Sequence, residues 1–467
     1  MYHAQVRHSG DNRLGLSIII LAAGQGTRMR SALPKVLQTV AGKPLLGHVL
    51  DGAQPLQASD ICIVYGHGGE AVRKAFQGES LRWVLQAEQL GTGHAMQQAM
   101  PGTLDENRVL VLFGDVPLLK SSTLSRLLDD TPDDDVAVLS VDMEDPSGYG
   151  RIVRDGGSVS CIVEEKDADA DIKAVREINT GVMVCPARKL KGWLDSLRSD
   201  NAQGEYYLTD VIAMAVNDNV TVHGIKADSA VEVMGINDKK QLAEAERAYQ
   251  ARLVDELMAE GVGFADPARV DIRGTLKCGR DVFIDVNAVF EGDVTLGDGT
   301  TIESNNLVRN CELGAGTVLH SNCHIEDSVT GSDCEIGPFA RLRPGVVLAN
   351  NVKVGNFVEI KKSTVADGSK VNHLTYIGDT EIGTGVNVGA GTITCNYDGA
   401  NKYKTVIGDG AFIGSGVELV APVTVGKGAT IGAGSTITKS TPDDKLTLER
   451  AKQFTVPGWK KPVKKGS

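Results

Sequence analysis

A repeat of six residues runs through the C-terminal half of the chain and restricts its fold more than any other feature. Neither the 3.6-residue period of a helix nor the two-residue period of a strand produces a repeat of six residues. A solenoid whose coils have flat faces does, because each face turns one aliphatic residue inward. Strands of a β-sandwich are a poorer explanation, because turn signals there recur every ~8–12 residues. The repeat positions form three runs: Ile284, Phe290, Leu296, Ile302 and Val308; Ile336, Leu342, Leu348, Val354 and Ile360; and Ile407, Ile413, Leu419, Val425, Ile431 and Ile437.

These hexapeptides resemble those of the left-handed parallel β-helix family, in which three repeats make one coil of eighteen residues. Glycines that follow many of the aliphatic residues, such as Gly408 and Gly414, leave room at the corners of a coil. The register slips by one residue between Ala366 and Val371, and again between Val388 and Ile407. We expect the coil to be locally redirected at these slips.

The N-terminal half has a different pattern. Short β-rich runs at 17–21, 61–65, 109–113 and 136–141 alternate with helical stretches, which predicts an α/β domain with a mostly parallel sheet. Residues 238–260 contain no glycine or proline and many helix formers, so we predict one long connecting helix that Gly261 closes. We therefore predict five segments: a leader (1–16), an α/β domain (17–237), a linker helix (238–261), a β-helix (262–445) and a tail (446–467).

Charge and cysteine content exclude some partners. The chain has 48 Lys and Arg against 60 Asp and Glu, a net charge of -12, which argues against nucleic acid as a partner. The eight cysteines show no CxxC or Cys/His ligand spacing and are typical of buried thiols in a reducing compartment.

The first apolar run, 16–23, follows Arg7 and Arg13 and has the general form of a short signal peptide. The Gly-Thr-Arg-Met sequence directly after it suits a phosphate loop better, so we expect residues 1–16 to be a poorly ordered leader. No other apolar run approaches the ~20 residues that a membrane span needs. We therefore expect a cytoplasmic protein without membrane insertion.

A glycine loop follows the first predicted strand. Residues 22–29, Ala-Ala-Gly-Gln-Gly-Thr-Arg-Met, allow close approach of the backbone to an anion, and Arg28 and Lys35 add positive charge. The loop matches neither the Walker pattern nor GxGxxG, so by itself it is weak evidence for phosphate binding.

Asp115 follows the predicted strand 109–113, from which Gly114 separates it. Ligands bind at the carboxyl ends of strands in open α/β sheets, and a carboxylate there can hold a divalent metal on a nucleotide. The alternative is a turn residue that only caps the strand.

The motifs LAAGxGTRM, LPK, QxEQLGTGHA, GD, GYGRI, VEEKDA, INTG and GIND resemble those of the sugar-nucleotide uridylyltransferases. Together with the hexapeptides, they make the chain similar along nearly its whole length to the bacterial bifunctional N-acetylglucosamine-1-phosphate uridyltransferase and glucosamine-1-phosphate acetyltransferase family. The resemblance implies a Rossmann-like nucleotidyltransferase domain joined by a long helix to a left-handed β-helix. It also implies acetylation of glucosamine-1-phosphate by acetyl-CoA, then UMP transfer from UTP that yields UDP-N-acetylglucosamine and pyrophosphate for peptidoglycan synthesis.

The same resemblance assigns residues of the first domain. Mg²⁺ is assigned to Asp115 and Asn237, and Lys35 and Arg28 are assigned to catalysis at the phosphates. At Gln25, relatives often carry lysine, so the loop has less positive charge here. The residues implied to bind UTP or the nucleotide-sugar product are Leu21, Ala22, Ala23, Gly24, Lys35, Gln86, Gly91, Thr92, Gly114, Asp115, Gly150, Glu164, Asn179 and Asn237.

Two cations recur at the coil spacing in the second domain. Arg343 and Lys361 are eighteen residues apart, so one coil places them one above the other at roughly 4.8 Å, the distance between neighbouring strands. Their repulsion is about 3 kcal/mol at an effective dielectric near 20, and a bound anion removes it. Alternatively, two solvated side chains lean apart.

His373 interrupts the aliphatic pattern beside one register slip. Its polar neighbours Tyr376, Asn387, Asn396 and Tyr397 favour catalysis over a satisfied core histidine. An amine that attacks a thioester must lose a proton, and histidine is suited to accept it near neutral pH.

The family resemblance implies that the amino sugar phosphate is bound by Arg343, Lys361, Tyr376 and Asn387. The residues implied to bind acetyl-CoA are Ala390, Asn396, Tyr397, Ser415, Ala433 and Arg450. It further implies that the acetyl-CoA site forms between the solenoids of a homotrimer. The basic tail 459–465 is more typical of a solvated chain end than of a second site.

Two other functions are compatible with parts of this pattern. One is a single-activity sugar nucleotidyltransferase with a structural or regulatory β-helix, against which Arg343, Lys361 and His373 argue. The other is a scaffold with an inactive transferase fold, against which Lys35, Asp115 and Asn237 argue.

Overall fold

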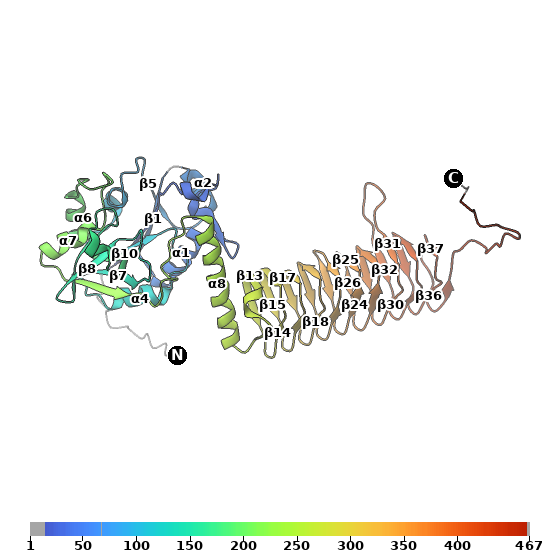
Figure 1. Ribbon diagram of the computed structural model, residues 1–467. Coiled ribbons are helices and arrows are strands. Elements are labelled where there is room, and N and C mark those ends of the chain that lie inside the picture. Colours follow the sequence, from blue (N-terminus) through green and yellow to red (C-terminus); the bar gives the residue numbers. More distant parts are fainter. Residues whose placement is uncertain (1–14, 67, 465–467) are drawn as a thin grey trace, which may run out of the picture. The chain divides into compact units, whose positions relative to one another are not determined.

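The computed structural model describes residues 15–66 and 68–464, and the chain separates into two compact units, Met1–Tyr249 and Gln250–Ser467 (Figure 1). Most of the predicted leader, residues 1–14, lies outside the described part, as does Lys465 of the basic tail. Within the described ranges, no helix combines the length and apolar character needed to cross a membrane.

The first unit is built on a mixed sheet with strand order β11-β7-β10-β6-β1-β4-β5. Its central strands pair in parallel, and β10 alone on this path runs antiparallel to both neighbours. The mostly parallel sheet predicted from the alternating pattern is therefore confirmed. The strands are β1 (Leu16–Ala22), β4 (Asp60–Tyr65), β5 (Arg82–Leu85), β6 (Arg108–Phe113), β7 (Val136–Asp142), β10 (Glu177–Pro186) and β11 (Val222–Lys226). Off this path, β8 (Arg151–Asp155) pairs with β10, and β9 (Ser158–Val163) pairs with β8; β2 (Thr39–Val40) and β3 (Lys43–Pro44) form a separate pair.

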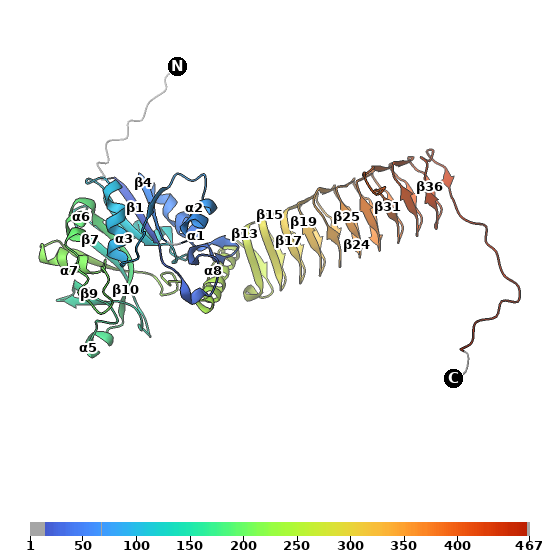
Figure 2. The same ribbon diagram turned by 90° about the horizontal axis from the view of Figure 1, so that it is seen from above.

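Helices cover both faces of this sheet (Figure 2). Successive residues of β1 enter opposite cores, with Ile19 in one and Ile18 and Ile20 in the other, because side chains alternate across a strand. One core is completed by α3 (Thr92–Ala99), α6 (Ala187–Asp195) and α7 (Asp210–Asn217); the other by α1 (Leu45–Ala53), α2 (Gly69–Ala75) and α4 (Ser121–Asp129); α5 (Ala170–Lys173) lies between β9 and β10 in the chain. Burial on both faces explains why the central strands are almost wholly apolar.

The predicted connecting helix is α8 (Lys239–Ala259). Its first turn is capped by Asp238, whose Oδ1 accepts from the backbone N of Gln241 at 2.8 Å. The chain leaves the helix through Gly261, whose φ of 100° suits glycine. Sequence and structure therefore agree on this helix to within one residue at each end.

The second unit is a parallel β-helix in which each coil contributes strands to three faces. Neighbouring coils pair in parallel throughout. The first face comprises β12 (Gly263–Phe264), β14 (Phe283–Ile284), β16 (Thr301–Ile302), β18 (Val318–Leu319), β21 (Glu335–Ile336), β24 (Lys353–Asn356), β27 (Lys370–His373), β30 (Asn387–Val388), β33 (Phe412–Ile413), β36 (Thr430–Ile431) and β38 (Leu446–Thr447).

The other two faces start together and then separate. Strands β13 (Val270–Cys278), β15 (Ala288–Leu296) and β17 (Leu307–Leu313) run through both. The second face continues with β19 (His324–Glu326), β22 (Arg341–Leu342), β25 (Glu359–Lys361), β28 (Tyr376–Gly378), β31 (Ile393–Cys395), β34 (Glu418–Val420) and β37 (Thr436–Ile437). The third continues with β20 (Ser328–Thr330), β23 (Val346–Leu348), β26 (Thr364–Val365), β29 (Thr380–Ile382), β32 (Thr405–Ile407) and β35 (Val423–Val425).

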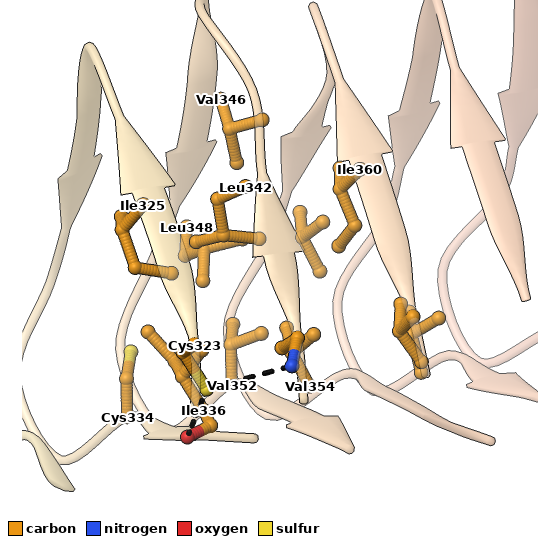
Figure 3. Close-up of a cluster of buried hydrophobic side chains, with 14 of the residues drawn as sticks. Cys323, Ile325, Cys334, Ile336, Leu342, Val346, Leu348, Val352, Val354 and Ile360 are labelled. Carbon is orange, nitrogen blue, oxygen red and sulfur yellow. Dashed lines mark hydrogen bonds between the residues drawn. The ribbon is translucent and has the colours of Figure 1, made fainter. Parts of the chain in front are cut away.

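The interior of the β-helix is one continuous core, in which the residues of the six-residue repeat pack with other buried side chains such as Cys334 and Val352. Figure 3 shows Ile336, Leu342, Leu348, Val354 and Ile360 pointing into it from successive strands. These five side chains are at most 1% exposed. The prediction that each repeat position faces inward is confirmed.

The coils are not all eighteen residues long, and the predicted slip before Val371 is one of the places where a coil is shorter. Ile336 and Val354 are partners eighteen residues apart, but Val354 and Val371 are only seventeen apart. The slip that the sequence placed after Ala366 lies earlier, because Val365 rather than Ala366 is the inward residue. The turn that shortens this coil contains Lys362, whose φ of 45° is left-handed.

The second predicted slip, between Val388 and Ile407, has a different cause. Val388 pairs with Ile413, twenty-five residues further on, because residues 396–404 leave the coil as a loop between β31 and β32. This loop contains several predicted site residues.

Candidate functional site

A cavity of about 280 Å³ opens at the carboxyl ends of β1 and β6 in the first unit. It brings together predicted residues from four separate motifs. The lining residues are Leu21, Ala22, Ala23, Gly24, Lys35, Val36, Gln86, Gln89, Gly91, Thr92, Ala95, Phe113, Asp115 and Glu205. The sequence analysis missed five of these, Val36, Gln89, Ala95, Phe113 and Glu205. The amide of Gln89 donates to the carbonyl oxygen of Ala23 and so braces the glycine loop.

Two predicted residues of the neighbouring motifs, Gly114 and Arg28, do not line this cavity. Gly114 packs behind it, where an added Cβ would come within 3.1 Å of the Ala22 side chain. Arg28 is exposed on the 3-10 turn η1 (Thr27–Met29) and does not line the cavity, and Gln25 is also exposed.

Lys35, Asp115 and Asn237 meet at one edge of the cavity. The Lys35 ammonium pairs with Oδ2 of Asp115 and donates to Oδ1 of Asn237 at 3.2 Å. The backbone N of Ile236 donates to the Asp115 carbonyl oxygen at 2.9 Å, which keeps Asn237 close to the end of β6.

The two oxygens that face Lys35 suit a hard divalent cation. Such a cation is usually held by one or two protein oxygens together with phosphate oxygens and waters. Consistent with that arrangement, the described residues contain no group of three or more His, Cys, Asp and Glu side chains that could enclose a metal. Asp115 and Asn237 therefore fit a metal that a nucleotide helps to hold.

Gly150, Glu164 and Asn179 also lie together. The backbone N of Asn179 donates to the Gly150 carbonyl oxygen at 2.8 Å, and a Cβ on Gly150 would lie 3.3 Å from the Glu164 carboxylate. Burial raises the pKa of Glu164, a hydrogen bond from Thr209 opposes this, and neighbouring carboxylates add to the rise. This carboxyl is well placed to bond a neutral hydroxyl ligand.

These three residues connect to the cavity through the bulge in β10. Oδ1 of Asn179 accepts from the backbone N of Gly181 at 3.0 Å. Gly181 has a φ of 85°, and a Cβ there would come within 2.4 Å of the Phe113 ring, which lines the cavity. Only glycine fits between this bulge and Phe113.

In the second unit, Arg343 and Lys361 lie on adjacent coils of the second face, as the spacing predicted. Arg343 is partly neutralised by Glu359, whose Oε1 accepts from Nη1 at 2.8 Å. The pKa of Lys361 is lowered, first by Lys402 and then by Arg343. These three cations form a cluster in which like charges repel one another. A bound anion would offset this repulsion.

The sequence analysis missed Lys402 and Glu359. Lys402 belongs to the loop 396–404, where it forms a bridge with Tyr397, and it is forty-one residues from Lys361. No periodic pattern could have paired them, because the loop lies outside the six-residue repeat.

His373 ends strand β27 on the first face and is exposed, which excludes the core-histidine interpretation. Its Nδ1 lies 2.9 Å from Oδ1 of Asn356, which is its register partner on β24. A cavity of about 270 Å³ adjoins both residues; its lining also includes His320, Glu335, Gly337, Lys353, Val354, Gly355 and Asn372.

The corner after His373 divides the predicted acetyl-transfer residues between two faces. His373 and Asn387 belong to strands of the first face, whereas Arg343, Lys361 and Tyr376 lie along the second. Within one chain, the cations Arg343 and Lys361 therefore lie on one side of the corner and His373 lies on the other.

Ala390, Ser415 and Ala433 lie on successive coils at this same corner. The Ala390 and Ser415 carbonyl oxygens accept from the next coil at 2.7 and 2.8 Å, and a Cβ on Gly414 would lie 2.5 Å from the Ala433 nitrogen. Arg450 reaches the column, since its Cδ is 3.8 Å from a Cβ built on Gly434.

Asn396 and Tyr397 lie at the start of the loop 396–404. Asn396 is 7% exposed and donates to Oδ2 of Asp379 at 2.5 Å, whereas Tyr397 is exposed. They therefore belong with Lys402 and not with the Ala390 column.

Comparisons with known proteins agree with both halves of this description. Residues 18–205 match the MobA-like NTP transferase domain, and residues 327–362 and 404–439 match the bacterial transferase hexapeptide (six repeats). The bifunctional protein GlmU of Aromatoleum aromaticum is 58% identical over 451 residues, which cover 96% of this chain and 99% of the relative. The bifunctional GlmU proteins of Azoarcus sp. and Nitrosomonas eutropha are each 56% identical, covering 96% and 97% of this chain and 100% and 99% of the relatives.

Identity of this level over nearly the full length of both chains covers the two compact units together. It extends through the nucleotide cavity, the long helix and the β-helix. The chain belongs to the family of bifunctional GlmU proteins.

Proposed function

We infer that this chain is a bifunctional transferase that acetylates glucosamine-1-phosphate with acetyl-CoA and then transfers UMP from UTP to the product. The products are UDP-N-acetylglucosamine and pyrophosphate. The observation that carries the proposal is the presence of two separate sites suited to phosphate groups, one in each compact unit. A single-activity nucleotidyltransferase would have no use for the cation cluster of the second unit.

In the first unit, the glycine loop and Lys35 hold the triphosphate, and Gln86, Gly91 and Thr92 hold the uridine. The sugar phosphate oxygen attacks the α-phosphorus in line and displaces pyrophosphate. Such a transfer needs positioning and charge neutralisation and no protein nucleophile. Arg28, next to the glycine loop, stays a prediction as a second phosphate contact.

Asp115 and Asn237 would hold Mg²⁺ at this site. When bound, it supplies neutralisation of the charge that builds on the phosphate oxygens. Lys35 pairs with the same two residues and so lies where the phosphates would approach the metal ligands. Gly150, Glu164 and Asn179 bind the sugar, and the raised pKa of Glu164 favours bonds with neutral hydroxyls.

In the second unit, Arg343, Lys361 and Lys402 bind the phosphate of glucosamine-1-phosphate, and Tyr376 and Asn387 contact the sugar. His373 takes a proton from the ammonium group of glucosamine-1-phosphate. The free amine then attacks the thioester carbonyl of acetyl-CoA. Coenzyme A leaves as the thiol once the tetrahedral intermediate collapses. Acetyl-CoA lies along Ala390, Ser415, Ala433 and Arg450, with Asn396 and Tyr397 near its acetyl end.

A homotrimer completes this site. The histidine and the cations of one chain lie on opposite sides of the corner between the first and second faces. That corner carries exposed apolar residues: Phe339 and Phe357 stack with ring centroids 5.2 Å apart, and Leu374 follows one coil later. All three have left-handed φ, where bulky side chains are rare. Contact with another copy of the chain would cover this stripe and bring its cations towards His373.

The cytoplasm is the compartment that fits these substrates. All eight cysteines are free thiols, as expected of a reducing environment. The domain roles remain a prediction: residues 17–237 carry uridylyl transfer, residues 262–445 carry acetyl transfer, and 238–261 link them. The predicted tail, 446–467, begins too early, because Leu446 and Thr447 form β38 and pair with β36 on the first face.

Mass spectrometry of the reaction products tests both activities in one experiment. The full chain is given glucosamine-1-phosphate, acetyl-CoA, UTP and Mg²⁺, with each component omitted in turn. We expect N-acetylglucosamine-1-phosphate without UTP or Mg²⁺, and UDP-N-acetylglucosamine only with all four. Formation of a nucleotide sugar without acetyl-CoA would contradict the order of the two reactions.

A further inference from the structure

The side-chain amide of Gln86 is held in one orientation by two acceptors. Its Nε2 lies 3.0 Å from the carbonyl oxygen of Gly91 and 3.2 Å from Nδ1 of His94. An amide nitrogen carries two hydrogens, so these two contacts use its full donor capacity. Gln86 is 4% exposed and lines the nucleotide cavity.

The Gly91 carbonyl decides which end of the amide faces it. A carbonyl oxygen only accepts, so Oε1 of Gln86 in the same position would repel it. The carbonyl itself cannot turn away easily, because it accepts from the backbone N of Ala95 at 3.1 Å as α3 begins. Gly91 is also confined: its φ is 111°, and a Cβ there would lie 2.6 Å from the Tyr206 oxygen.

His94 must then accept at Nδ1, so its neutral ring carries the proton at Nε2. Nε2 of His94 lies 3.2 Å from Nε2 of Gln98, one turn further along α3. Gln98 is exposed, so its amide can turn its oxygen to the ring N–H, whereas Gln86 is buried and held by Gly91. Gln86 and not Gln98 therefore decides which nitrogen of His94 carries the proton.

This arrangement leaves Oε1 as the only free hydrogen-bonding group at the end of Gln86. Among the described residues, none donates to it. The side chain thus offers the cavity an acceptor and no donor.

We propose that His94 is a positioning residue for base selection, and that it acts by holding Gln86 with Oε1 towards the nucleobase. This inference rests on the proposed binding of UTP in the cavity. The N3–H of uracil can donate a hydrogen bond to Oε1. N3 of cytosine carries no hydrogen and is itself an acceptor, so it would leave Oε1 without a donor. A site built to bond one group discriminates strongly against an analogue that leaves its acceptor unsatisfied.

The test compares kcat/KM for UTP and CTP, with N-acetylglucosamine-1-phosphate as the second substrate, in the full-length protein. The variants are His94→Phe, which keeps a ring but removes the acceptor, and His94→Asn, whose Oδ1 can replace Nδ1 as acceptor. We expect wild type and His94→Asn to prefer UTP to a similar degree. In His94→Phe the preference should fall at least about tenfold, because the Gly91 carbonyl is then the one remaining acceptor among the two that hold the amide, and its orientation is less restricted.

Each outcome decides a separate point. An unchanged UTP preference in His94→Phe, or an equal loss of preference in both variants, would overturn the role of His94. No turnover of UTP by the wild type would instead refute the proposed uridylyl transfer.

Competition by UMP and CMP against UTP provides a second readout. We expect UMP to bind better than CMP in wild type and in His94→Asn, with a smaller difference in His94→Phe. Should His94→Phe lack a cooperative melting transition, His94→Leu takes its place, and the comparison with His94→Asn still decides the inference.

Discussion

Nδ1 of His373 and Oδ1 of Asn356 lie 2.9 Å apart on register partners of neighbouring coils. An amide oxygen only accepts, so the ring carries its proton at Nδ1 and leaves the Nε2 lone pair for a substrate proton. Replacement of His373 by Ala should lower kcat for acetyl transfer by about 10²–10⁴-fold, with little change in KM.

The control for this variant is uridylyl transfer, which should be unchanged because it takes place in the other unit. Asn356→Ala should give a smaller loss of acetyl transfer, since the base remains but is less well oriented. Retention of more than about a tenth of wild-type acetyl transfer by His373→Ala would assign the histidine a structural role.

Asp115→Asn should abolish detectable uridylyl transfer and leave acetyl transfer near normal. The change removes the anionic oxygen that pairs with Lys35 and that we assign to Mg²⁺. Asp51→Asn is a matched control, because Asp51 also pairs with a lysine, Lys43, but at an exposed position. Steady-state assays of both reactions on both variants check this; parallel loss of the two activities in folded Asp115→Asn would contradict two independent sites.

Lys361→Ala and Lys402→Ala should each raise KM for glucosamine-1-phosphate by about tenfold or more, because charge-assisted hydrogen bonds to phosphate are strong. The Lys402 change should also raise the pKa of Lys361, since Lys402 is the first cause of its lowered value. Lys404→Ala is the control: Lys404 lies in the same loop but pairs with exposed Glu381. A KM shift as large in the control as in Lys402→Ala would show that the loop as a whole, and not the cation, is responsible.

Ile336→Ala should destabilise the β-helix by about 2–5 kcal/mol, because it opens a cavity in a closely packed interior. Ile336 is fully buried, whereas Val329 on the neighbouring β20 is 43% exposed. Val329→Ala should therefore change the free energy of unfolding by less than about 0.5 kcal/mol. Urea unfolding monitored by circular dichroism compares the two, and similar midpoints would refute the inward orientation.

Cys311 and Cys323 should resist alkylation by iodoacetamide in the native protein at pH 8. Burial disfavours the charged thiolate and raises the pKa of each thiol to about 11, so the reactive form becomes abundant only above that pH. Unfolding removes the burial, and both thiols should then react readily. Mass spectrometry of native and urea-treated samples measures this, and rapid native labelling of either cysteine would contradict a closed interior.

The repeat of six residues determined the β-helix without help from the tertiary structure. Ile336, Leu342 and Leu348 each meet the same environment, so burial of one position follows from its place in the repeat. The glycine loop and Asp115 were equally accessible to sequence reasoning, because the carboxyl ends of parallel strands lie at one edge whatever the details of the fold.

Contacts across irregular segments were decided by the tertiary structure alone. Lys35 meets Asn237 across 202 residues, and Lys402 meets Lys361 only because a loop interrupts the coil. The sequence displays the slip before Val371, but the tertiary structure alone locates the turn that produces it, which contains Lys362 in a left-handed conformation. A periodic sequence specifies which side chains turn inward, whereas the meeting of outward side chains depends on turn lengths and loop paths that only the folded chain fixes.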